Sequence, residues 1–148
     1  MFVMKTLFTS YRPFLLSLLC SILVLLWVYT AASKLADMPE FKRQLGNQTL
    51  GRPMAAFLLW FIPLSEIAAT LLLLPRKTRL AGFVLSAFLL LLFSGYIALV
   101  LLGYYDRVPC SCGGVLKQLS WGPHLVFNLF FLLAAMAGVW LEKIARKP

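Results

Sequence analysis

Residues 54–74 read MAAFLLWFIPLSEIAATLLLL, a stretch with one acid, Glu66, and no Lys or Arg. About 20 consecutive apolar residues are enough to cross the hydrocarbon core of a bilayer as a helix. A single apolar segment can satisfy its own backbone hydrogen bonds in lipid only when it is helical. We therefore predict a membrane-spanning helix here, with Glu66 about midway along it.

Three further apolar runs cover residues 14–32, 80–102 and 125–141, and the last can begin at Trp121 because Pro123 is tolerated in a first helical turn. The chain has 148 residues, of which 61% are hydrophobic and 13% charged. A soluble domain carries about 25% charged residues, and a disordered chain is poor in aromatic residues, so both classes are excluded. The sequence predicts an all-α polytopic protein, one membrane domain of residues 1–148 arranged as a four-transmembrane-helix up-down bundle.

The distribution of Lys and Arg predicts the orientation. Eight of the fourteen lie in the N-terminal segment, the short second loop and the C-terminal segment, and the other six are spread over two longer loops. Because Lys and Arg concentrate in short cytoplasmic segments, we expect both termini in the cytoplasm and the long loops outside. The net charge of +9 then serves orientation and contact with anionic lipid, and nucleic acid is not an expected partner.

The first long loop has the pattern of a short interfacial helix. Asp37 and Glu40 have the spacing of a capping box. Met38, Phe41 and Leu45 follow at helical spacing and give this segment one apolar face.

Two cysteines one residue apart stand in the third loop, where residues 109–114 read PCSCGG. If this loop faces outward, Cys110 and Cys112 lie in a compartment where disulfides form. A disulfide between them would close a very small, strained ring and would be a good oxidant. An inert structural pair, or half of a metal site completed by His124, are the alternatives. We interpret Cys20, in the first span, as a packing residue.

Polar residues in or near the spans are the other candidates. A carboxylate at the membrane centre costs about 2.5–3.5 kcal/mol, so Glu66 should face the bundle, either as a neutral hydrogen-bond donor or exchanging protons with a redox partner or quinone. His124 and Asn128 share a helix face below the cysteine loop, where the imidazole could stabilise a thiolate or bond to loop backbone. We interpret Lys34, at the end of the first span, as an interfacial residue whose ammonium reaches toward water.

Short motifs along nearly the whole chain resemble one family. They are Ala32-Ser33-Lys34-Leu35, the loop helix from Asp37 to Leu45, Pro63-x-x-Glu66, Arg79 through Gly82, the segment from Cys110 to Gly114, Leu119-Ser120-Trp121, and His124-Leu125-x-Phe127-Asn128. On these motifs the chain is similar to the MauE/DoxX group of small four-helix membrane proteins, the methylamine-utilisation protein E branch in particular.

The resemblance implies a bacterial inner-membrane protein linked to redox work. Members of the group are associated with maturation of a disulfide-rich, quinone-cofactor amine dehydrogenase alongside a periplasmic thioredoxin-like protein, or with thiosulfate and quinone oxidation. A quinone is therefore a possible cofactor. This chain has no Cys-x-x-Cys and no second outer thiol pair, which puts autonomous catalysis in doubt.

The leading hypothesis is a thiol-redox accessory protein, or a thiol-disulfide oxidoreductase itself. In this hypothesis Cys110 and Cys112 exchange electrons with a periplasmic thioredoxin-like or cysteine-rich client protein, and Glu66 and His124 support proton movement. The alternatives are a small proton-coupled transporter that uses Glu66, and a non-catalytic assembly subunit of a membrane complex. The client, the electron acceptor and the oligomeric state stay open.

Overall fold

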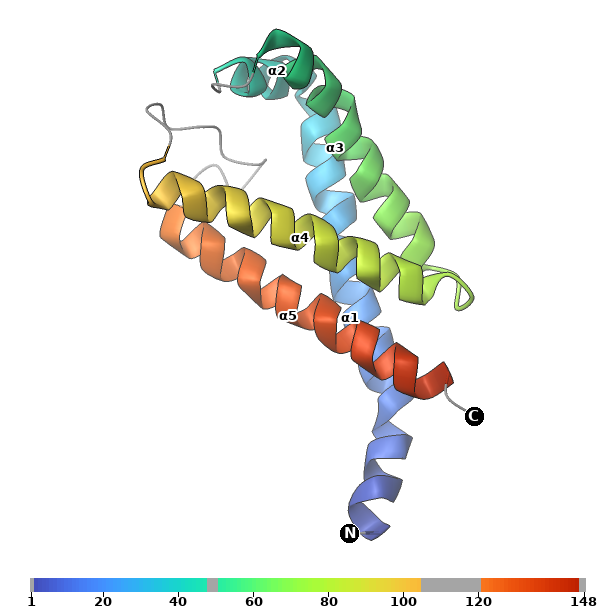
Figure 1. The fold of residues 1–148 in the computed structure, drawn as a ribbon. Helices are drawn as coiled ribbons and strands as arrows, with labels where there is room; N and C mark the ends of the chain where they lie inside the picture. The colour runs from blue at the N-terminus through green and yellow to red at the C-terminus, as the bar shows by residue number, and fades with distance from the viewer. Residues whose placement is uncertain (1, 48–50, 105–120, 147–148) are drawn as a thin grey trace.

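The computed structural model describes residues 2–47, 51–104 and 121–146, and in this part of the chain all regular structure is helical (Figure 1). The helices are α1 (Phe2–Ala36), α2 (Met38–Gly46), α3 (Arg52–Leu73), α4 (Arg79–Leu101) and α5 (Trp121–Arg146). All but α2 are long and apolar enough to cross a membrane. The predicted all-α class and its four membrane-crossing helices are thereby confirmed.

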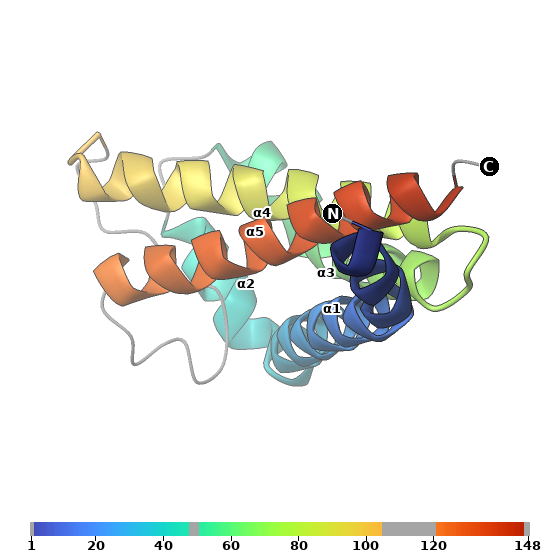
Figure 2. The same ribbon diagram turned by 90° about the horizontal axis from the view of Figure 1, so that it is seen from below.

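The four long helices form a closed ring of contacts. Helix α1 packs against α3 and α5, and α4 packs against α3 and, most extensively, α5. Figures 1 and 2 show α4 and α5 side by side, crossing α1 obliquely. We call the end where α1 and α4 finish the loop end, and the opposite end, with the α3–α4 turn, the turn end. At the turn end, Arg146 of α5 donates to the carbonyls of Arg76 and Lys77 at 3.1 and 3.0 Å.

Two glycines allow close approach between neighbouring helices. A Cβ added at Gly82 would lie 2.7 Å from the backbone nitrogen of Leu73, and one added at Gly138 would overlap the ring of Phe83. Helices in lipid associate through close packing of small residues, because lipid offers no hydrophobic driving force between them. Gly82 therefore fits α4 against α3, and Gly138 fits α5 against α4.

The core lies between the long helices and contains a polar link between α1 and α4. Trp27 and Phe83 are among its largest fully buried side chains. The indole Nε1 of Trp27 donates to the hydroxyl of Ser86 at 2.9 Å, so neither polar group is left unpaired in the interior. Cys20, predicted to be a packing residue, is buried in the same core, and its thiol donates to the carbonyl of Leu73 at 3.3 Å.

The outer surface of the ring is apolar. Large exposed hydrophobic side chains occur on each long helix, among them Phe14, Phe57, Leu91 and Phe130. In water such a surface would drive aggregation, but lipid solvates it without cost. The protein therefore fits a bilayer environment, as predicted.

The short helix of the first long loop is also confirmed. Asp37 caps α2, and its carboxylate accepts from the backbone N–H of Glu40 at 3.3 Å. Phe41 and Leu45 are buried on the face of α2 that packs against α3 and α1. Helix α2 thus packs at the loop end of α1 and α3 (Figure 1).

Candidate functional site

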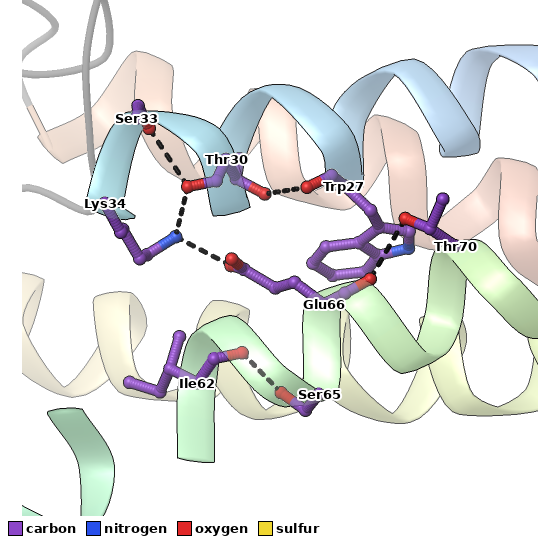
Figure 3. Close-up of polar contacts among 8 residues, drawn as sticks. All are labelled: Trp27, Thr30, Ser33, Lys34, Ile62, Ser65, Glu66 and Thr70. Carbon is purple, nitrogen blue, oxygen red and sulfur yellow. Dashed lines mark hydrogen bonds and ion pairs between the residues drawn. The ribbon is translucent and has the colours of Figure 1, made fainter. Parts of the chain in front are cut away.

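A buried ion pair joins α1 to α3. The ammonium of Lys34 lies 2.7 Å from Oε1 of Glu66, and the two side chains are 3% and 1% exposed. The ammonium also donates to the backbone carbonyl of Thr30, one turn earlier in α1, at 3.2 Å (Figure 3). Two opposite charges therefore neutralise each other inside the bundle, within membrane-spanning helices.

The interpretation of Lys34 as an interfacial residue reaching toward water was wrong. Its side chain turns inward to Glu66 instead (Figure 3). A carboxylate without a partner in an apolar interior is strongly disfavoured, whereas a cation within hydrogen-bond distance offsets much of that cost. The carbonyl of Thr30 gives the ammonium a second acceptor. These two acceptors favour the buried position of Lys34 over the interface.

Local hydrogen bonds hold the helix turns around this pair. Thr70 donates to the backbone carbonyl of Glu66 at 3.1 Å, and Ser65 donates to that of Ile62 at 2.7 Å. On α1, Ser33 donates to the carbonyl of Thr30 at 3.0 Å. The hydroxyl groups of Ser33, Ser65 and Thr70 are thus satisfied within their own helices (Figure 3), and the two charged groups pair across helices.

The second carboxylate oxygen of Glu66 has no hydrogen-bond partner among the described residues, although it is buried. Glu66 lines a cavity of about 20 Å³. The cavity is lined by residues of α1, α3, α4 and α5, namely Leu26, Trp27, Thr30, Lys34, Glu66, Leu90, Phe93, His124, Phe127 and Asn128. Roughly 10–15 Å³ is enough for one water molecule, and a buried water needs two or more polar partners. The cavity therefore suits a water bound to Glu66.

The structure brings His124 to the same cavity. His124 is 2% exposed, and Asn128, one turn further along α5, is 7% exposed and lines the cavity beside it. The imidazole stacks on Trp121, with ring centroids 6.4 Å apart and planes at 9°. Of the predicted site residues, Glu66 and His124 are thus brought together from different helices.

The two predicted cysteines, Cys110 and Cys112, lie outside the described residues. The residue that sequence reasoning missed as a site residue is Lys34. A signal for it existed, since acids inside membrane spans are usually paired, and Lys34 is the basic residue nearest to the end of the first predicted span.

Comparison with known proteins identifies the family. The family model of methylamine utilisation protein MauE matches residues 12–141. The chain belongs to the MauE family. The matched range includes Lys34, Glu66 and His124, as well as Cys110 and Cys112. No curated protein and no solved structure matches the chain.

A quinone does not fit the cavity of this MauE family member. Pockets for organic ligands measure roughly 300–1,000 Å³, and the cavity beside Glu66 measures about 20 Å³. At this volume the cavity has room for about one water molecule.

Proposed function

We propose that this protein is a bacterial inner-membrane accessory of methylamine utilisation that exchanges disulfides through Cys110 and Cys112. The partner would be a periplasmic thioredoxin-like protein or a cysteine-rich client. MauE family membership supports the membrane accessory role, and the tandem cysteines of the third loop support the thiol chemistry.

The observation that carries the proposal is the position of the polar site relative to that loop. The loop leaves α4 after Leu101 and returns at Trp121, both at the loop end of the bundle. His124, in the first turn of α5, is buried in the cavity with Glu66. The two ends of the segment that carries both cysteines therefore meet the bundle at the same end as His124, one of the buried groups that can hold a proton.

The proposed exchange transfers one disulfide from the membrane protein to its partner. A thiolate of the reduced partner attacks one sulfur of the Cys110–Cys112 disulfide, and the partner's second thiolate then resolves the mixed disulfide. The partner leaves with a disulfide, and Cys110 and Cys112 accept two electrons and two protons. A strained ring of this size favours electron flow toward the membrane protein.

In this proposal Glu66 and His124 support the proton part of the reaction. A water in the cavity would link the unpaired oxygen of Glu66 to the imidazole of His124, while Lys34 holds the other oxygen at 2.7 Å. Lys34 acts here as a positioning residue. It contacts Glu66, and it is far from both cysteines in the sequence.

A proton-coupled transporter that uses Glu66 has less support. A transported substrate would need a binding volume near Glu66, and the cavity there holds about one water. The carboxylate is also paired with Lys34, which leaves one of its two oxygens for a substrate.

The experiment uses the oxidised full-length protein in nanodiscs and reduced thioredoxin as the probe. We expect one thioredoxin disulfide per chain, measured as protection from a maleimide gel-shift reagent. Replacing both outer cysteines by serine should abolish the transfer, and the control Cys20→Ser should leave it unchanged. Transfer that persists in the Cys110→Ser/Cys112→Ser protein would show that the mechanism is wrong.

A further inference from the structure

A second, larger hollow lies between α2 and the beginning of α3, and it shares no residue with the cavity beside Glu66. Its volume is about 400 Å³. Two of its lining side chains are basic, Lys42 from α2 and Arg52 from the first turn of α3. Its apolar wall comes mainly from α3, from Ala55, Ala56, Leu59 and Trp60. We call this hollow the α2–α3 groove.

The positive charges of the α2–α3 groove are not neutralised within the described part of the protein. Among the described residues, neither Lys42 nor Arg52 forms an ion pair with an acid, in contrast to Lys34, Arg43 and Arg146. Glu40, the acid of α2, is already held by Arg43 at 2.7 and 2.8 Å and by Gln44 at 2.7 Å. Two exposed cations therefore face one hollow, which suits an anion, and Arg in particular suits phosphate.

The apolar wall of the groove runs along α3. Ala55 and Ala56 lie about one helical turn after Arg52 in α3. Their small side chains give the groove depth next to the two charges. Leu59 and Trp60 continue the wall by one more turn, roughly 5 Å further along the helix. Trp60 is 58% exposed and Phe57 57% exposed on the same helix, so the groove opens onto the lipid-facing surface.

We infer that the α2–α3 groove binds one anionic phospholipid. The phosphate lies between Lys42 and Arg52, and one acyl chain follows Ala55, Ala56 and Trp60 along α3. The basic pair favours an anion over a neutral quinone, and the opening toward lipid favours a membrane lipid over soluble phosphate. Because the groove is formed by both helices, a bound lipid also holds α2 against α3.

The inference does not depend on the thiol chemistry, and native mass spectrometry of the full chain tests it. The probes are phosphatidylglycerol and phosphatidylcholine, added at equal concentration to the delipidated protein in detergent. We expect one tightly bound phosphatidylglycerol with at least about tenfold preference over phosphatidylcholine. Lys42→Gln/Arg52→Gln should remove most of that preference.

The matched control is Lys77→Gln/Lys143→Gln, which removes the same charge from exposed side chains at the turn end. We expect this variant to keep the wild-type preference. Ala56→Trp, which fills the groove without changing charge, should weaken binding of both lipids.

Three outcomes would overturn the inference. The first is an unchanged preference in Lys42→Gln/Arg52→Gln. The second is an equal loss in the control variant, which would mean diffuse attraction to the surface. The third is complete displacement of the lipid by millimolar inorganic phosphate, which would identify a phosphate site.

Discussion

At the scale of single residues, the Lys34–Glu66 pair is the feature that most constrains this protein. Burying two charges costs more than burying apolar side chains of the same size, and their attraction offsets that cost only with good geometry. At 2.7 Å and with almost no exposure, the geometry is favourable. Removing one partner should therefore lower the free energy of unfolding far more than removing both.

We predict that Lys34→Met destabilises the protein by about 3–5 kcal/mol, because Glu66 loses its cation inside the bundle. Glu66→Gln should cost less, since the amide oxygen can still accept from the ammonium. The double variant should be more stable than the sum of the two losses implies, with a coupling of roughly 0.5–3 kcal/mol. Unfolding in mixed micelles with increasing dodecyl sulfate measures all three.

Lys143→Met is the control, because Lys143 is exposed and in no ion pair of the described residues. It should change stability by less than about 0.5 kcal/mol. Strict additivity of Lys34→Met and Glu66→Gln would contradict the buried pair.

At the scale of elements, the contact of α4 with α5 depends on the absence of a side chain at Gly138. Phe83 of α4 occupies the space that a Cβ at this position would need, and Phe83 is fully buried. Close packing of this kind leaves little room for adjustment.

We predict that Gly138→Ala lowers stability by about 1–3 kcal/mol, because the new methyl group overpacks against Phe83. The matched control is Gly95→Ala in α4, where an added Cβ meets nothing within 4 Å. That change should raise stability by about 0.5–1 kcal/mol, because alanine has the higher helix propensity. Thermal unfolding in detergent distinguishes them. Equal behaviour of both variants would argue against the α4–α5 contact as described.

At the scale of the whole molecule, the functional proposal requires that the loop end faces the periplasm. The density of Lys and Arg predicts this orientation, with six of the fourteen spread over the loop-end segments and eight at the other end. A protein with the opposite orientation would present its tandem cysteines to a reducing compartment.

We predict that a membrane-impermeant maleimide, applied to spheroplasts after mild reduction, labels Cys110 and Cys112. Cys20 should stay unlabelled, because it is buried in the core. A Lys77→Cys marker at the turn end should react only after the membrane is permeabilised. The reverse pattern of labelling would exclude exchange with periplasmic partners.

The membrane helices and the short helix α2 could be predicted from the amino-acid sequence alone. Both depend on local properties: the length of apolar runs, and a cap followed by apolar residues at helical spacing. The sequence also singled out Glu66 and His124, because polar groups in apolar spans are unusual wherever they occur.

The contacts of those residues could not be predicted in this way, because they depend on how the helices pack. Lys34 and Glu66 are 32 positions apart and lie on different helices, so their pairing follows from the packing of α1 against α3. His124 reaches the same cavity because α5 packs against α1 and α4. Hydropathy measures how each segment interacts with lipid, whereas the direction of a charged side chain depends on which partner the packed helices bring within hydrogen-bond distance.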